Sequence, residues 1–304
     1  MEFIGAVDIG GTKIAVGLVT EQGQVLARHT FPSRPEQTFE SVMVEIAGVL
    51  RGQMADLGGT SLGIGLGSTG QVNPRTGVVL NNSILTSWSG RNPVSWLEES
   101  FHVSVALEND ADAGALAEWS LGAGAKAGRM IYVTISTGIG AGMVFDGRLY
   151  RGAKGVHPEV GHHTIDPSGP ACFCGNRGCW EVLASGNALA ERLRSTNPEF
   201  SGDAVQVCDL AEAGEPLAQT VVKEHAQALG IGLANLIIMY APDVIVLGGG
   251  LMQRAALFLP AAQVTIADRC HLVPPRNTRL VLSAFGVDSA LVGAAQVWAY
   301  HYAL

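Results

Sequence analysis

Three of the five cysteines lie within eight residues and could bind a metal ion. They are Cys172, Cys174 and Cys179, in a C-x-C-x4-C spacing with two glycines that permit tight turns. Two histidines, His162 and His163, stand about ten residues upstream. Three thiolates and one imidazole complete a tetrahedral shell with no open position, which is typical of structural zinc. The alternatives are three unrelated loop thiols, or a disulfide that would leave one thiol over.

Two glutamates, Glu159 and Glu181, flank this segment outside the expected metal shell, where a rigid loop would hold them as acceptors for sugar hydroxyls. The run from Gly161 to Glu181, G-H-x6-G-x2-C-x-C-G-x2-G-C-x-E, resembles the zinc signature of the ROK family of sugar kinases and repressors. The resemblance implies that His162 binds both zinc and sugar and that the two glutamates hold sugar hydroxyls. Spacing alone leaves His162 and His163 as alternative ligands, and the family spacing favours His162.

Composition places the chain among well-buried globular proteins with room for two domains. Of 304 residues, 47% are hydrophobic and only 15% are charged. The net charge of −8 argues against binding to nucleic acid, which needs a basic face. No apolar run is long enough to span a membrane and no signal peptide is visible, so we expect a cytoplasmic protein. Cys208 and Cys270 stand alone and are expected to be reduced thiols.

A glycine turn follows the first apolar run. Phe3–Val7 predicts a buried strand and Ile14–Val19 a second one. The residues between them that could hold a nucleotide phosphate are Asp8, Gly10, Gly11, Thr12 and Lys13. The glycines allow close approach, Thr12 offers a hydroxyl, Lys13 a cation, and Asp8 can hold a magnesium-bound water. A plain hairpin is the alternative, because short glycine motifs are weak signals. The stretch resembles the first phosphate loop of the actin-like ATPase fold, to which ROK proteins belong.

Polar residues follow the next expected strand, Ser61–Leu66. Such strand ends are where open α/β sheets bind ligands. The candidates for the wall of a sugar site are Ser68, Gly70, Gln71, Asn82 and Ser83. They could equally be turn residues.

An Asn-Asp pair ends the expected strand Val103–Leu107 and precedes a helix that begins near Asp112. A carboxylate at such a junction is well placed to take a proton, although it could also be a helix cap. Asn109 and Asp110 match the catalytic pair of the ROK family. That resemblance implies that Asp110 takes the proton from the attacking sugar hydroxyl and that Asn109 binds a neighbouring hydroxyl.

The strand–turn–strand pattern recurs about 125 residues later. Met130–Ile135 predicts a strand, and Met143–Phe145 another. The turn between them contains the expected phosphate contacts Thr137, Gly138 and Gly140. Two similar halves indicate an internally duplicated fold. The resemblance identifies this turn as a second phosphate loop.

A third glycine turn follows the continuous β-branched run Val244–Leu247, which predicts a buried parallel strand. Its residues are Gly248, Gly249 and Gly250, where the family places the adenosine; a simple strand-to-helix turn is the alternative. Upstream, Leu217–Tyr240 predicts one or two helices, while residues 195–216 are uninformative. A last helix is predicted over Ala290–Tyr302, and the resemblance implies that it crosses back to the first domain.

The resemblance covers residues 4 to about 295 and implies a two-domain α/β fold of the actin-like ATPase (ribonuclease H-like) type, with a central cleft and a zinc-binding loop. We expect a small domain of residues 1–112 and 289–304 and a larger one of residues 113–288. The implied activity is ATP-dependent phosphorylation of a hexose at C6, most like the glucose-phosphorylating members, with ATP, Mg²⁺ and structural Zn²⁺. A kinase for N-acetylmannosamine or N-acetylglucosamine is the alternative. A sugar-sensing repressor would carry a DNA-binding domain, for which the loop at Asp8 leaves no room ahead. Family members are commonly homodimers or homotetramers.

Overall fold

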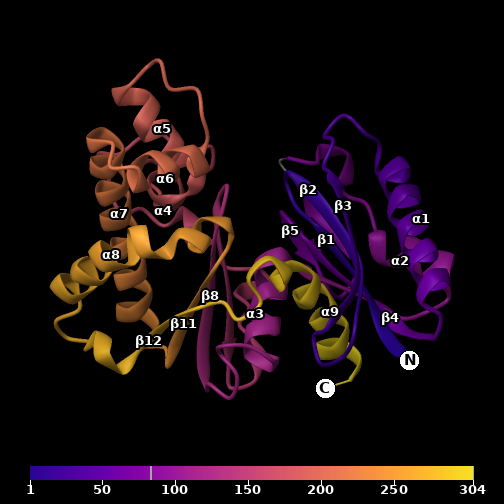
Figure 1. The fold of residues 1–304 in the computed structure, drawn as a ribbon. Helices are drawn as coiled ribbons and strands as arrows, with labels where there is room; N and C mark the ends of the chain where they lie inside the picture. The colour runs from indigo at the N-terminus through magenta and orange to yellow at the C-terminus, as the bar shows by residue number, and fades with distance from the viewer. Residues whose placement is uncertain (83, 304) are drawn as a thin grey trace. The chain divides into compact units, whose positions relative to one another are not determined.

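The computed structural model describes residues 1–82 and 84–303 and forms two compact units (Figure 1). Unit 1 consists of Met1–Gly128, Gly142–Pro158 and Ser283–Leu304, and unit 2 of Arg129–Ala141 and Glu159–Leu282. The boundaries expected from the sequence assign residues 113–128, 142–158 and 283–288 to the second domain, whereas their contacts group them with unit 1. Ser83, an expected sugar contact, lies outside the described residues.

The sheet of unit 1 has five strands in the order β3-β2-β1-β4-β7. Their bounds are Val25–Pro32, Lys13–Val19, Glu2–Ile9, Thr60–Ser68 and Val105–Asn109. Strand β2 is antiparallel to its neighbours β3 and β1, whereas β4 runs parallel to both β1 and β7. The carboxyl ends of β1, β4 and β7 therefore meet at one edge of the sheet.

Helices cover both faces of this sheet, which explains why its central strands are apolar on both sides. Alternate residues of β1 point to opposite cores: Phe3 and Val7 pack with α1 (Phe39–Leu57) and α2 (Pro93–Phe101), while Ile4 packs with α9 (Ser289–Tyr302). Unit 1 also contains the hairpin β5 (Gln71–Asn73) and β6 (Val78–Asn81), the helix α3 (Asp110–Ser120), and the short helices η1 (Thr86–Trp88), η2 (Ala153–Gly155) and η6 (Gly286–Asp288).

Every second residue of strand β4 from position 63 to 67 is glycine, so one face of the strand has no side chains there. This lets α9 and α3 lie close to the sheet. A Cβ at Gly65 would lie 1.8 Å from the carbonyl oxygen of Ala294 on α9, and one at Gly63 would overlap the Trp298 ring. The third glycine, Gly67, faces α3, where a Cβ would lie 3.3 Å from that of Ala113. The pattern thus brings the start of α3 against the strand ends.

Residues 113–128 belong with unit 1 because α3 packs on α9. A Cβ at Gly293 would lie 2.8 Å from the backbone of Ala113. At the other end of α3, the buried carboxylate of Glu118 accepts hydrogen bonds from Ala123 N at 2.9 Å and Ala284 N at 3.0 Å. Glu118 thereby holds the chain where it re-enters unit 1.

The second sheet has the order β10-β9-β8-β11-β12. The bounds of these strands are Arg148–Leu149, Ile139–Phe145, Arg129–Ile135, Val244–Gly248 and Arg279–Leu282. Strand β11 is buried and parallel to both β8 and β12, as its β-branched run predicts. The helices of unit 2 are α4 (Trp180–Ala184), α5 (Gly186–Thr196), α6 (Ala204–Glu212), α7 (Pro216–Tyr240), α8 (Ala255–Arg269), η3 (Val160–His162), η4 (Gly250–Arg254) and η5 (Pro275–Asn277).

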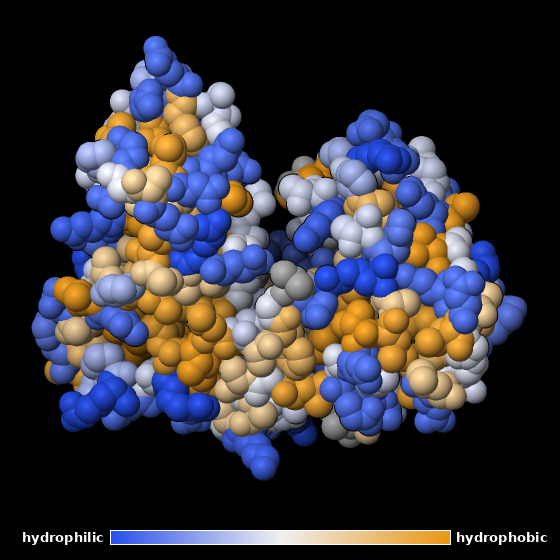
Figure 2. Space-filling view, viewed as in Figure 1, coloured by the Kyte–Doolittle hydropathy of each residue, from blue (hydrophilic) through white to orange (hydrophobic). Residues whose placement is uncertain are grey.

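Two helices of unit 2 refine the expectations from sequence. Residues Pro216–Tyr240 form one continuous helix, α7, and the uninformative region before it contains α6. Figure 2 shows apolar side chains gathered over β11 and β12 of this unit, and a mixture of polar and apolar ones around α5 and α6. Within residues 1–82 and 84–303, none of the helices combines the length and apolar character needed to span a membrane.

Candidate active site and metal site

Two carboxylates of unit 1 lie at the ends of the two strands that flank β4. Asp8 is near the end of β1, and Asp110 begins α3 directly after β7. The strand between them contributes Gly67, whose register partner on β1 is Asp8. A Cβ at Gly67 would lie 3.5 Å from Asp8 Oδ1 and 3.6 Å from the Cα of Asp110. Because Gly67 has no side chain, the two acidic residues can approach each other across β4.

The electrostatics of Asp8 reflect this approach. Burial, with the negative charge of Asp110 as a second cause, raises the pKa of the Asp8 carboxyl to about 7, and Lys13 opposes the shift. Charged groups held close to one another at a strand end are unfavourable for folding and are typical of functional sites. A bound cation would relieve the repulsion, because carboxylate oxygens are preferred ligands of Mg²⁺.

The expected catalytic pair is ordered by hydrogen bonds at the start of α3. Asn109 Oδ1 accepts from Ala111 N at 2.9 Å, and Asp110 Oδ1 accepts from the same N–H at 2.9 Å. Asn109 Nδ2 donates to the carbonyl of Gly70 at 3.1 Å. Asn109 therefore caps the helix and joins it to the loop that leads into β5.

The other expected sugar contacts of unit 1 divide into buried and exposed residues. Asn82 is buried, and its Oδ1 accepts from Leu85 N at 2.7 Å while its Nδ2 donates to the Thr69 carbonyl at 3.0 Å. This pattern is that of a residue that stabilises its own loop. Ser68 is likewise buried, whereas Gln71 is exposed at the start of β5.

The first glycine turn joins β1 to β2 and is closed by its own backbone. Gly10 N donates to the carbonyl of Lys13 at 3.1 Å, while the Ser33 hydroxyl donates to Gly10 O at 2.7 Å and Ser33 N donates to Thr12 O at 3.0 Å. Thr12 and Lys13 are exposed. The turn presents a hydroxyl and a cation on a loop whose shape depends on neighbouring backbone and Ser33.

The second glycine turn, residues 136–140, joins β8 to β9 and is held differently. Gly186 N at the start of α5 donates to Ser136 O at 2.7 Å, and Asn187 N donates to Thr137 O at 3.4 Å. At its other end, Ile139 N donates to Glu181 Oε2 at 2.8 Å. A residue expected to bind sugar thus supports the expected phosphate loop.

The third glycine turn has a packing reason for two of its three glycines. A Cβ at Gly248 would lie 2.4 Å from the hydroxyl of Tyr132, and one at Gly249 would lie 2.3 Å from Ile135 O. Both clashes are with β8. In contrast, a Cβ at Gly250 would meet no atom within 4 Å among the described residues, so this glycine is the most open of the three.

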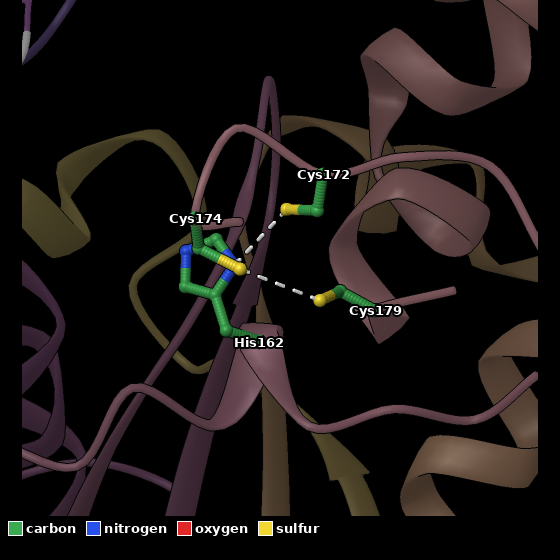
Figure 3. A group of neighbouring side chains, drawn as sticks. All are labelled: His162, Cys172, Cys174 and Cys179. Carbon is green, nitrogen blue, oxygen red and sulfur yellow. Dashed lines mark hydrogen bonds between the residues drawn. The ribbon is translucent and has the colours of Figure 1, made fainter. Parts of the chain in front are cut away.

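Four side chains of unit 2 form a metal-sized cluster (Figure 3). The donor atoms of His162, Cys172, Cys174 and Cys179 all lie within 4.8 Å of one another. Cys174 Sγ and Cys179 Sγ are 3.6 Å apart, and Cys172 Sγ is 3.5 Å from His162 Nδ1. An ion about 2.3 Å from each sulfur in a tetrahedron requires sulfur atoms about 3.8 Å apart. The donor set and its spacing therefore fit Zn²⁺ with a closed shell.

Local structure separates His162 from His163. His162 ends η3, and its ring packs edge-on against Phe173 of the cysteine loop. His163 Nδ1 lies 2.5 Å from the carbonyl of Val160, and its ring packs on Trp180. His163 thus faces the core, and His162 is the histidine that lies with the three thiols.

The pKa values of the three thiols are shifted in different directions. Burial raises the pKa of Cys179 to about 12 and also raises that of Cys172, whereas a hydrogen bond from the backbone N–H of Asn176 lowers the pKa of Cys174. A cation at the centre would favour all three thiolates. The described cysteines are free, so no disulfide competes for them.

A buried ion-pair network, which the sequence did not reveal, holds the two carboxylates on either side of the Asn109-Asp110 pair. Arg151 lies between Glu108 and Asp112, with its guanidinium 2.6 Å from Asp112 Oδ2. His157 Nδ1 is 2.7 Å from the same oxygen, and His301 Nε2 is 3.0 Å from Glu108 Oε1. Although burial opposes it, the two carboxylates raise the pKa of Arg151. The alternating acidic residues at 108, 110 and 112 were the available signal, since buried carboxylates require a cation.

The sequence of the chain matches one known family along nearly its whole length. The sequence pattern of the ROK family matches residues 4–300, and the chain belongs to this family. Membership accounts for the α/β organisation with two mixed five-stranded sheets. The recognition made from the zinc signature and the Asn-Asp pair is therefore confirmed.

Relatives within the family include both kinases and regulators. The chain is 30% identical to glucokinase from Thermotoga maritima over 312 residues, which covers 98% of this chain and 97% of that protein. It is 28% identical to the xylose repressor of Bacillus spizizenii over 298 residues, which covers 97% of this chain and 77% of the repressor. The crystal structure of a ROK family glucokinase from Streptomyces griseus in complex with glucose and AMPPNP superposes with a TM-score of 0.83 at 30% identity, covering 97% of this chain and 98% of that one. The predicted fold class is thereby confirmed.

Proposed function

We propose that this protein is a hexose kinase that transfers the γ-phosphoryl group of ATP to the C6 hydroxyl of its sugar, and that glucose is the preferred sugar. The observation that carries the proposal is the approach of Asp8 and Asp110 across Gly67. One carboxylate that can take a proton beside another that can hold a cation is the minimum that phosphoryl transfer to a hydroxyl requires. The similarity to glucokinases and to the complex with glucose and AMPPNP supports it.

Asp110 is the proposed general base. Its Oδ1 is oriented by the N–H of Ala111, which leaves the carboxylate fixed at the start of α3. Asn109, whose amide group has a further hydrogen to donate, would bind a neighbouring hydroxyl. Arg151 holds the residues on both sides of this pair and would keep it in place during turnover.

The nucleotide would be bound by residues of the glycine turns. In unit 1 these are Asp8, Gly10, Gly11, Thr12 and Lys13; in unit 2 they are Thr137, Gly138, Gly140, Gly248, Gly249 and Gly250. Mg²⁺, when bound to the nucleotide, neutralises charge on the phosphates. Asp8 would hold this ion through its water ligands, and Lys13 would bind a phosphate directly.

The sugar would be bound by carboxylates and the imidazole beside the metal cluster. Glu159 directly precedes η3, Glu181 lies in the first turn of α4, and His162 lies between them in the chain. Gly70, Gln71 and Ser83 are further proposed contacts. Zn²⁺ held by His162 and the three cysteines would fix these groups structurally.

The Asp110→Asn variant tests the catalytic assignment. An asparagine Oδ1 still accepts from Ala111 N, so we expect the fold and the sugar affinity to be retained. Without a base, kcat should fall by about 10³-fold. The measurement is a coupled ADP-release assay with glucose. Asp146→Asn is the matched control, because Asp146 lies in a hairpin turn at φ 51°, where asparagine is tolerated. An unchanged kcat in Asp110→Asn would remove the assignment.

A sugar-sensing regulator is the second candidate, because a xylose repressor has a similar level of identity over the same region. The same ADP-release assay with glucose, mannose, N-acetylglucosamine, N-acetylmannosamine and xylose separates the candidates. A kinase turns over at least one of them, and comparison of kcat/KM identifies the preferred sugar. Binding of a sugar without turnover of any would favour the regulator.

A further inference from the structure

The peptide group of Ile139 lies between two segments of unit 2. On one side its N–H donates to Glu181 Oε2 at 2.8 Å. On the other side its carbonyl lies against Gly161, where a Cβ would be 2.2 Å from the oxygen. Ile139 belongs to the second glycine turn, Gly161 to the segment that contains Glu159 and His162, and Glu181 to α4. A proposed nucleotide turn and two segments with proposed sugar contacts therefore meet at one residue.

Gly138 completes this contact. A Cβ at Gly138 would lie 2.4 Å from Glu181 Oε2 and 3.2 Å from its Cδ, so the carboxylate rests directly on the turn. Gly138 is not among the residues with positive φ, and alanine could adopt its backbone conformation. A substitution here would thus displace Glu181 without straining the turn itself.

Glu181 cannot easily move away from its position. It lies in the first turn of α4, whose N-cap is the metal-cluster residue Cys179, and the residue between them, Trp180, is fully buried. Among the described residues, the hydrogen bonds of Glu181 engage Oε2 and leave Oε1 for another donor. The carboxylate is therefore a fixed point with one oxygen on the turn.

We propose that Glu181 couples the two substrates energetically: through Oε2 it holds the second phosphate turn in its binding conformation, and through Oε1 it accepts a sugar hydroxyl. This inference rests on the proposed function. A sugar that fixes the Glu181 carboxylate also fixes the N–H of Ile139, which lowers the entropy that a bound triphosphate must still remove. By linkage, the nucleotide strengthens sugar binding by the same factor. Glu181 is thus a positioning residue for the nucleotide and a contact for the sugar.

Titration calorimetry of the zinc-loaded full chain measures this coupling. Glucose is titrated with and without AMPPNP and Mg²⁺, and AMPPNP with and without glucose. We expect each ligand to lower the Kd of the other by about 5-fold, within the usual range of coupling between sites. Gly138→Ala should weaken glucose binding several-fold, although residue 138 lies in the nucleotide turn, and should bring the coupling factor to about 1.

Gly250→Ala is the matched control, because this glycine is also in a proposed nucleotide turn but has open space at its Cβ position. It can change nucleotide affinity, and its coupling factor should equal that of the wild type. Glu181→Gln and Glu181→Ala give a second test that does not depend on Gly138→Ala folding. Glutamine can still accept from Ile139 N and should retain nucleotide affinity without sugar within about 2-fold, whereas alanine should lose it several-fold.

The outcomes separate the coupling from the function on which it rests. If the wild type binds and phosphorylates glucose with no coupling, or if Gly138→Ala keeps the wild-type factor, the coupling proposal is overturned and the kinase stands. Equal nucleotide affinity in Glu181→Gln and Glu181→Ala overturns it too. If the wild type binds neither AMPPNP nor any tested sugar, the proposed function and the coupling both fail.

Discussion

The first two glycine turns share a strand–turn–strand form but are held in place by different groups. The turn of unit 1 is closed by backbone hydrogen bonds and by Ser33, and it carries Lys13. The turn of unit 2, Ser-Thr-Gly-Ile-Gly, has no charged residue and rests on the carboxylate of Glu181 and the N–H groups that begin α5. The first turn supplies charge, and the second supplies backbone donors whose position depends on other elements.

This difference identifies what each turn responds to. None of the residues that hold the first turn is a proposed sugar contact. Substitutions in this turn should therefore change the affinity for the nucleotide and not the affinity for the sugar. The second turn is held by Glu181, which lies two residues after the metal-cluster residue Cys179. We therefore expect loss of the metal to disorder the second turn. The proposed coupling would thus make the second of two similar turns, and not the first, dependent on the metal and the sugar.

The largest expected effect comes from removing a metal ligand. In Cys172→Ser we expect zinc to be lost, sugar binding to be abolished and the free energy of unfolding of unit 2 to fall by at least about 3 kcal/mol, because metal binding and folding are coupled at closed sites. The nucleotide should bind more weakly as the second turn loses Glu181. Metal content by atomic absorption and thermal unfolding are the measurements.

Cys208→Ser is the control for that experiment. Cys208 is also buried, but it lies on α6 outside the cluster. It should retain zinc and lose only about 1–2 kcal/mol, the usual effect of a polar atom in a core. A zinc-free Cys172→Ser protein with wild-type stability and sugar affinity would show that the cluster supports neither.

The sequence predicted those parts of the site in which chemistry and spacing are local. The C-x-C-x4-C spacing indicated the metal cluster, and the structure brings its three thiols together. The alternation of strand and turn around Lys13 predicted both ends of β1 and of β2 to within about two residues. In both cases the residues that determine the structure are neighbours in the chain.

Contacts between distant segments could not be predicted in this way. Ile139 and Glu181 are separated by 42 positions, and Arg151 and Glu108 by 43. Nothing near Arg151 in the sequence distinguishes it from a surface arginine. The partners of Arg151 are buried carboxylates of two successive elements, Glu108 on β7 and Asp112 on α3. The packing of the whole unit thus decides which charges become partners.

Lys13→Met should produce a smaller effect that sharpens the comparison of the turns. Loss of one charged contact to a phosphate is expected to raise the Kd for MgATP by about 10-fold. Glucose affinity without nucleotide should be unchanged, because the first turn rests on no sugar contact. Calorimetry with each ligand separately measures both. Lys223→Met, at an exposed position of α7, is the control and should leave both affinities unchanged. Weaker glucose binding in Lys13→Met would contradict the independence of this turn.

The smallest expected effect comes from removing the carboxyl group of Asp8, which lies directly before the first glycine turn. Because burial and Asp110 raise the pKa of Asp8 from 3.8 to about 7, the folded chain retains a proton that the unfolded chain releases between these values. The contribution of Asp8 to stability is therefore full below about pH 4 and is lost as the pH rises to about 7. Asparagine at this position has no charge to repel Asp110. Asp8→Asn should thus stabilise the protein at about pH 8 by about 1–2 kcal/mol, with no gain near about pH 4.

Urea unfolding at several pH values, without added Mg²⁺ or nucleotide, measures the difference between Asp8→Asn and the wild type. Protonation of the metal ligands at low pH affects both proteins equally and cancels in that difference. Added Mg²⁺ should stabilise the wild type more than the variant, since the ion compensates the two carboxylates. Asp146→Asn, in a hairpin turn, should show no such pH-dependent gain. A gain for Asp8→Asn that does not change with pH would mean that neither burial nor Asp110 raises the pKa of Asp8 in the folded chain. The first turn would then lack the electrostatic cost that distinguishes it from the uncharged turn of unit 2.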